Sequence, residues 1–267
     1  TPVDLNLSKT ANLPESYTNS QGKVINYTKE QIEDSKISIE ETLKNNGLDM
    51  SVLKDLIEIP VYATNNLTWE TFCADKLEEI KAEFPMLRYD TSEYDIYVKD
   101  NVLVEYYNNE FLLREDYNNN EYIMICNYDS MEELRNRILS DGSTITIAGK
   151  EYKSKYNECK SGFISMSTSH TNTGIILVPD NCELTESMKK QYLFVANYNA
   201  DTKEGKEEIE KIFVDDNSEL LQNLDKNGLN IDGTTKIALM EASVGLATIV
   251  TFIAIYLGII FLIASAA

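Results

Sequence analysis

The last 26 residues of the chain, 242–267, contain no charged side chain. An α-helix of that length is about 39 Å long, whereas the hydrocarbon core of a bilayer is about 30 Å thick. The sequence therefore predicts a transmembrane helix here. A buried core helix is the alternative, although soluble domains seldom contain one uniformly apolar helix this long. A secretory signal is excluded, because this segment is too long and lies at the carboxyl end.

The predicted membrane helix carries a row of small side chains at spacings of three and four residues: Ser243, Ala247, Thr251, Ala254 and Gly258. Small residues allow helix backbones to approach closely in lipid, where packing drives helix association. The row therefore predicts packing against partner helices. The alternative is that such residues are simply common in membrane spans.

The 241 residues before this helix hold all 44 acidic and 24 basic side chains, which give a net charge of -20. That length is sufficient for one large domain or for two lobes. No repeat and no low-complexity linker marks a boundary within it. We therefore divide the chain into a soluble domain, residues 1–236, and a membrane helix with a short lead-in, residues 237–267.

The two ends of the chain indicate a piece of a longer membrane protein. The chain begins at Thr1 rather than at a methionine, and it ends in ASAA without a basic residue to close the helix. Lys226 and Lys236 are the only basic residues within about 20 positions before the helix, and cytoplasmic flanks usually carry more. This composition slightly favours an extracellular position for the domain.

Four cysteines, Cys73, Cys126, Cys159 and Cys182, allow two disulfides in three possible pairings, or none. Cys126 ends an apolar run and is predicted to be a buried free thiol.

Helix and strand signals are interleaved along the soluble part, which predicts an α+β fold with antiparallel strands. Caps, prolines and glycines give the element limits in the first part of the chain. The expected order is an irregular lead-in (1–22), an extended piece (24–27), a helix from a capping box of Thr28 and Gln31 to Gly47, a strand (56–62) placed at an edge by Pro60, and a helix (69–84) capped by Thr68.

Asparagine-rich turns separate short apolar runs in residues 94–126, which predicts an antiparallel meander. The remaining elements follow from the same capping and turn signals. They are a helix capped by Ser130 and Glu133 and ending at Leu139, a hairpin (145–148 with 151–156), a buried strand (175–178), a helical patch (185–190), a strand (192–198), an acidic helix around 204–213 and a helix (219–226) ending at Gly228.

Catalytic signatures are weak. Gly142, Gly149 and Lys150 superficially resemble a phosphate-binding loop, but the glycine spacing is wrong and Glu151 replaces the residue that binds magnesium. We therefore expect no ATPase activity and no bound cofactor. His170 is the only histidine, so histidine-pair zinc sites are excluded. Its polar neighbours favour a surface loop over a catalytic base.

A partial calcium loop is present at residues 223–234. Asn223, Asp225 and Asn227 alternate before Gly228, but Thr234 replaces the bidentate glutamate. Gly228 is therefore interpreted as a helix cap. The glutamates of the 204–210 helix are interpreted as a solvated face. Asp215 and Asp216 could likewise be either solvated residues or part of a site.

Several segments of the chain carry a family resemblance. They are TPVDLNLSK, VYATNNLTWETF, ITIAGKEYK, TGIILVPD and the closing TTKIALMEASVGLATIVTFIAIYLGIIFLIASAA. Together they resemble the bacitracin-export type of ABC-transporter permease in the FtsX-like permease superfamily, over nearly the whole chain. In that family a large extracellular domain lies between the seventh and eighth membrane helices. The resemblance implies that this chain is that domain followed by the eighth helix.

The resemblance also implies a function and partners. Such a permease works with a cytoplasmic ATPase subunit, often beside a two-component sensor kinase, to remove or sense cell-wall-targeting peptide antibiotics in Gram-positive bacteria. The ligand expected for the domain is a peptide antibiotic or its lipid complex, and no nucleic acid. An acidic surface concentrates cationic peptides within a Debye length of about 8 Å, although acidity also serves solubility. Two alternatives remain: an anchored extracellular sensor or assembly module without transport, and a membrane-anchored surface enzyme.

Overall fold

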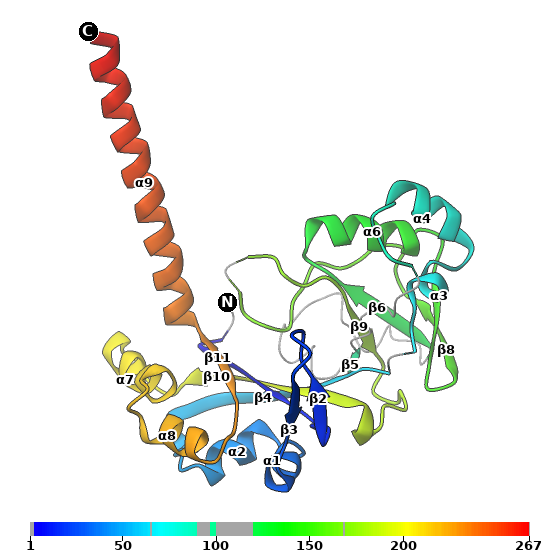
Figure 1. Cartoon of the computed structure of the whole chain (residues 1–267), viewed down its shortest axis with the longest axis horizontal. Helices are drawn as coiled ribbons and strands as arrows, with labels where there is room; N and C mark the ends of the chain where they lie inside the picture. Colours follow the sequence, from blue (N-terminus) through cyan, green and yellow to red (C-terminus); the bar gives the residue numbers. More distant parts are fainter. Residues whose placement is uncertain (1–2, 65, 90–96, 100–119, 168, 267) are drawn as a thin grey trace.

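The computed structural model describes residues 3–64, 66–89, 97–99, 120–167 and 169–266. These residues form an α+β domain from which one long helix, α9 (Lys236–Ala266), projects (Figure 1). The predicted fold class is confirmed. Residues 236–262 of α9 are long and apolar enough to cross a membrane, with a mean hydropathy of 2.5 and none of the span buried.

One mixed sheet runs through the domain in the order β11-β1-β10-β4-β5-β9-β6-β8-β7. Neighbouring strands are antiparallel except for the parallel pairs β5–β9 and β6–β8. Its strands are β1 (Leu5–Thr10), β4 (Leu53–Tyr62), β5 (Tyr97–Lys99), β6 (Glu121–Ile125), β7 (Thr144–Ile147), β8 (Lys150–Ser154), β9 (Ile175–Val178), β10 (Lys189–Tyr198) and β11 (Asp232–Thr235). A separate hairpin joins β2 (Ser16–Thr18) to β3 (Val24–Asn26).

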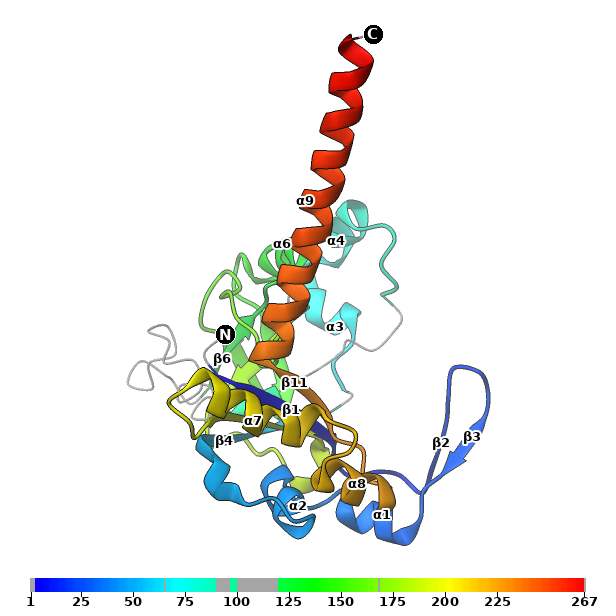
Figure 2. The same ribbon diagram turned by 90° about the vertical axis from the view of Figure 1, so that its left-hand side faces the viewer.

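Helices cover the sheet unevenly. The helices are α1 (Lys29–Asp34), α2 (Ile39–Asn45), α3 (Trp69–Cys73), α4 (Leu77–Glu83), α6 (Asp129–Leu139), α7 (Lys203–Val214) and α8 (Glu219–Lys226). In Figures 1 and 2, α4 and α6 lie on the side of the sheet toward which α9 extends, whereas α1, α2 and α8 lie on the opposite side.

Three apolar clusters form the core. Alternate strand residues point to opposite faces of the sheet, so one strand can contribute to more than one cluster. In β10, Phe194 joins a cluster with residues of α2 and α8, while Val195 joins a second cluster on the other face. The second cluster includes Ile164 and Met166 from the segment after β8, and Leu239 of α9 packs against it. A third cluster joins α3, α4 and α6 to β6 and β9.

Most local predictions are confirmed. Thr28 and Gln31 form the expected capping box, and Thr68 caps α3. The β7–β8 hairpin turns at Ala148 and Gly149, both at positive φ, and Gly228 follows α8 with φ 65°. The strands predicted around 56–62, 175–178 and 192–198 are β4, β9 and β10. The predicted meander lies largely outside the described residues; within its range, β5 and β6 both pair with β9.

The predicted irregular lead-in is wrong. Residues 5–10 form β1, an internal strand between β10 and β11, and Leu5 and Leu7 are buried. The alternation of leucine with polar residues in LNLS is the period-two signal of a strand. The predicted edge position of Pro60 is also wrong in the sheet order, since β4 lies between β10 and β5. In the described residues β4 pairs with β5 at Tyr62. Pro60, two residues earlier in β4, is outside that pairing.

Both long helices predicted in the first half are interrupted. The helix expected to run to Gly47 is split into α1 and α2, and Ser38 caps α2 by accepting the Glu41 N–H at 3.0 Å. The helix expected over 69–84 breaks at Ala74, which has φ 46°. The capping box expected at Ser130 is absent, because α6 begins at Asp129 after Tyr128, whose side chain makes no cap hydrogen bond.

Candidate functional site

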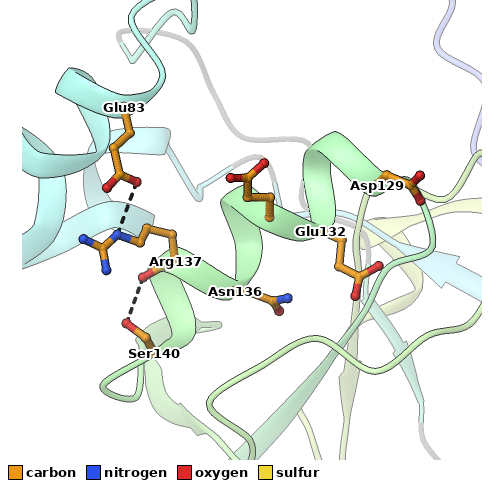
Figure 3. Close-up of a pocket in the computed structure, with 7 residues that line it drawn as sticks. Glu83, Asp129, Glu132, Asn136, Arg137 and Ser140 are labelled. Atoms are coloured by element: carbon orange, nitrogen blue, oxygen red, sulfur yellow. Dashed lines mark hydrogen bonds and ion pairs between the residues drawn. The ribbon is translucent and has the colours of Figure 1, made fainter.

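An open acidic groove of about 680 Å³ lies along α6 beside the end of α4 (Figure 3). Residues three and four apart on a helix share one face, and the α6 side of the groove follows that spacing. The lining residues are Glu83, Asp129, Glu132, Glu133, Asn136, Arg137 and Ser140. Four carboxylates and one guanidinium leave this lining with a net charge of -3.

One end of the groove is neutralised by ion pairs. Arg137 Nε lies 3.2 Å from Glu83 Oε2, as Figure 3 shows, and the same guanidinium pairs with Glu79. Lys76 Nζ lies near the carboxyl end of α6, donating to the Ser140 hydroxyl at 2.6 Å. The unbalanced negative charge is therefore concentrated at the amino-terminal half of α6, around Asp129 and Glu132.

The charge of the groove can attract cations. Asp129 and Glu133 are exposed to solvent, so their carboxylates interact with ligands through water-screened Coulomb forces. Among the described residues, no three histidine, cysteine or acidic side chains converge on a point that could hold a metal ion. The groove is suited to an extended, positively charged ligand rather than to a single ion.

A second feature is the junction between the domain and α9. β1 and β11 pair antiparallel, with Leu5 opposite Thr235, and the Lys236 N–H donates to the Asp4 carbonyl at 2.8 Å. The start of the described chain and the start of α9 therefore lie side by side (Figure 1). The Asp4 carboxylate also pairs with Lys206 of α7 at 2.6 Å and accepts the Tyr198 N–H at 3.1 Å.

Glu210 links α7 to the first turn of α9. Thr235 donates its hydroxyl to Glu210 and accepts the Ala238 N–H at 3.1 Å, as an N-cap does. Glu210 is only 6% exposed, so the predicted solvated face of this helix is wrong at this position. Burial raises the pKa of the Glu210 carboxyl, with the neighbouring Glu241 and Asp4 carboxylates acting in the same direction, while the hydrogen bond from Thr235 opposes them.

A Glu210→Gln variant is expected to lose part of the pH dependence of stability. Because the pKa is raised in the folded state, the folded protein keeps a proton that the unfolded chain releases above its ordinary value of about 4.5. The free energy of unfolding therefore falls as pH rises through this window. Glutamine keeps an acceptor for Thr235 but cannot ionise. Denaturant unfolding at a series of pH values should show a flatter profile for the variant.

The matched control is Glu208→Gln, an exposed position on the same helix. It removes the same charge without changing the junction. Equal pH profiles for the parent protein and Glu210→Gln would contradict the assignment of the buried proton to Glu210.

The small residues predicted to pack in the membrane all lie on α9. Ser243, Ala247, Thr251, Ala254 and Gly258 are all exposed, and Thr251 donates its hydroxyl to the Ala247 carbonyl at 2.8 Å. An added Cβ at Gly258 meets no atom within 4 Å. Their packing against partner helices stays a prediction.

The residues of the weak sequence motifs have structural roles or lie on the surface. His170 is exposed in the segment before β9. Gly142 precedes β7 and Gly149 follows it, so the two glycines do not belong to one loop. In the partial calcium loop, Asn223 and Asn227 donate to Asn46 at 3.0 and 2.8 Å, so these side chains hold α8 against the end of α2.

Sequence reasoning did not identify the groove or the buried Glu210. The spacing of Asp129, Glu132 and Glu133 was a usable signal for an acidic helix face. No comparable signal marks Glu210, because charged residues alternate with apolar ones around it on α7. No family model, no curated protein and no solved structure matches this chain.

Proposed function

We propose that this chain is the extracellular domain and the following membrane helix of an ABC-transporter permease that handles cationic peptide antibiotics or their lipid complexes. Its partners are a cytoplasmic ATPase subunit, which hydrolyses ATP, and a two-component sensor kinase. The parent protein crosses the membrane several times. The runner-up is a membrane-anchored extracellular sensor or assembly module without transport.

The observation that carries this proposal is the hydrogen bond between Lys236 N–H and the Asp4 carbonyl. When a domain is inserted between two consecutive membrane helices, the chain must enter and leave the domain at neighbouring points. The pairing of β1 with β11 supplies that arrangement directly beside α9. Termini that lie close together are common in domains, so the position beside the membrane helix is the informative part.

The acidic groove supports a cationic ligand. It lies on α4 and α6, which are on the same side of the sheet as α9. A peptide concentrated at a membrane surface would therefore meet the groove without passing around the domain. The attraction acts over about 8 Å at physiological salt, so it requires this proximity.

Charge reversal tests the groove. A triple variant, Asp129→Lys, Glu132→Lys and Glu133→Lys, should bind a cationic peptide antibiotic about tenfold more weakly, since three solvent-accessible charge pairs contribute about 0.5 kcal/mol each. Calorimetric titration of the chain in nanodiscs at low salt measures the change. The difference should shrink in high salt.

The control reverses three glutamates on α7: Glu204→Lys, Glu207→Lys and Glu208→Lys. It changes the net charge equally but leaves the groove intact. If both triple variants weakened peptide binding equally, the change in affinity would be due to overall charge, and the groove would be rejected as the binding site.

The permease itself is tested in native membranes. An antibody against residues 1–236 should detect a band far heavier than 30.3 kDa that retains an ATPase subunit through detergent extraction. A band near 30.3 kDa would favour the anchored sensor.

A further inference from the structure

We propose that a pocket between β1, β10 and the segment 163–175 binds a neutral sugar ring. The pocket has a volume of about 230 Å³ and shares no lining residue with the acidic groove. Sites for drug-sized ligands usually measure about 300–1,000 Å³, so this pocket fits a single ring rather than an extended peptide. A sugar site here would stand whether or not the chain belongs to a permease.

One side chain holds the walls of the pocket together. Asn172 Nδ2 donates to the Ile125 carbonyl of β6 at 3.1 Å and to the Gly162 carbonyl at 2.8 Å. Its Oδ1 accepts the Gly174 N–H at 3.0 Å. The two ends of the segment are therefore fixed to each other and to the sheet before any ligand binds. A pre-formed site avoids the entropy cost of ordering a loop on binding.

The lining suits an uncharged ligand that carries many hydroxyl groups. None of the described residues that line the pocket is charged, and a charged ligand group would lose its hydration there without gaining an ionic partner. The polar side chains are hydroxyls and amides, groups that both donate and accept hydrogen bonds. They belong to Ser8, Ser165, Thr171, Asn172, Thr173 and Gln191.

Most of these polar groups are available to a ligand. Four side chains make no hydrogen bond to any other residue in the part of the chain that the structure describes: Ser8, Thr171, Thr173 and Gln191. Phe163 and Leu193 add apolar surface to the lining. A sugar ring has an apolar face of C–H groups and a rim of hydroxyls, so it matches both parts of this lining.

A buried amide beside the pocket has an unused hydrogen-bonding group. Asn6 is only 3% exposed, and its Oδ1 accepts the Ser165 hydroxyl at 3.3 Å. Its Nδ2 has no partner among the described residues. Asn6 and Ser8 are two positions apart on β1, so both side chains point to the face of the sheet that carries the pocket. A ligand hydroxyl between Ser8 and Ser165 would accept this donor, and buried donors are rarely left unpaired.

The pocket lies on the face of the sheet where the membrane helix begins. Leu193 belongs to the apolar cluster on which Leu239 of α9 packs. A sugar ring could therefore come from a free saccharide or from the headgroup of a glycolipid in the same membrane. The two sources offer the same ring to the pocket and differ only in whether the bilayer carries it.

The test is saturation-transfer NMR on the full chain in nanodiscs without glycolipid. Glucose, galactose, mannose and N-acetylglucosamine are titrated separately, with empty nanodiscs as the blank. At least one sugar should receive saturation from the protein. A Thr173→Val, Gln191→Leu double variant should bind that sugar about tenfold more weakly, because both substitutions keep the shape of the side chain and remove its hydrogen bonds.

The matched control is a Thr146→Val, Gln21→Leu double variant, which makes the same two changes at exposed positions outside the pocket. It should bind the sugar as the parent protein does. Thr171→Val, at an exposed position of the lining, is a second pocket variant that does not depend on the folding of β10. The fluorescence of Trp69 on heating checks that each variant is folded.

Nanodiscs that contain a glucosyl diacylglycerol distinguish the two sources. If the headgroup fills the pocket, the signal of the free sugar should fall in these discs, whereas an unchanged signal assigns the site to free saccharides. The sugar site is rejected if none of the four sugars receives saturation, or if the folded pocket variants bind as tightly as the parent protein.

Discussion

Replacing Arg135 with alanine is expected to lower the free energy of unfolding by about 3 kcal/mol. Arg135 is only 4% exposed, although it carries a charge. Its guanidinium carbon lies 4.9 Å from the ring centroid of Trp69 and 5.1 Å from that of Phe72. Its Nε donates to the Thr173 carbonyl at 3.3 Å. Arg135 therefore joins α6 to α3 and to the segment before β9, and alanine removes all of these contacts.

Trp69 is the only tryptophan in the chain, so its fluorescence reports the region that Arg135 holds together. Urea unfolding of the chain in micelles gives the free-energy difference. The matched control is Arg137→Ala on the same helix, where the side chain is 37% exposed and pairs with Glu79 and Glu83. Exposed ion pairs contribute about 1 kcal/mol or less. Similar losses in the two variants would disprove the structural role assigned to Arg135.

The second large effect is expected for Lys9→Ala, which should also cost about 3 kcal/mol, since hydrogen bonds from a buried charged donor are lost. Lys9 is 5% exposed. Its ammonium group donates to the carbonyls of Asp34 and Ile37 at 2.9 and 2.6 Å and to the Thr42 hydroxyl at 2.9 Å. Asp34 ends α1, Ile37 lies between the two helices, and Thr42 lies within α2. The loss should be read from the same urea titration.

Lys36→Ala is the control, because this lysine is 48% exposed and pairs only locally with Glu33 at 2.7 Å. It should change the free energy of unfolding by less than about 1 kcal/mol. If Lys9→Ala lowered the free energy of unfolding no more than Lys36→Ala does, the Lys9 ammonium group would not be needed to hold α1 and α2 in place.

The shifted pKa of Lys9 predicts that the free energy of unfolding depends on pH. Burial lowers its pKa to about 8 from 10.5, against the opposing pull of the Glu58, Asp34 and Glu41 carboxylates. Between these two pH values the unfolded chain holds a proton that the folded protein has released, so this residue's contribution to stability rises with pH. A Lys9→Met variant should lack that rise. An unchanged slope in Lys9→Met would contradict the lowered pKa.

The parts of the fold that sequence reasoning predicted correctly depend on neighbouring residues. The cap at Thr28 needs Gln31, three positions away, and the turn at Ala148 and Gly149 needs only residues that tolerate positive φ. Such signals operate within one turn of chain. They identified α8 and its cap at Gly228, as well as the β7–β8 hairpin.

The errors arose where distant residues decide local structure. The break between α1 and α2 is stabilised by Lys9, which lies 25 positions before Asp34. Ser38 followed by Glu41 was a local signal of a second helix start, but it competed with a continuous apolar face. β1 was missed although LNLS carries the period-two signal of a strand; its internal place in the sheet depends on β10 and β11, which lie near the other end of the domain.

The candidate site follows the same division. The sequence alone determined that the chain has an acidic α+β domain and a helix apolar enough to span a membrane, because charge and hydropathy are properties of composition and local period. Only the tertiary structure decided that Asp4 meets Lys236 and that Glu210 is buried against Thr235. The physical reason is that these contacts depend on the order of strands in the sheet, which no local pattern encodes.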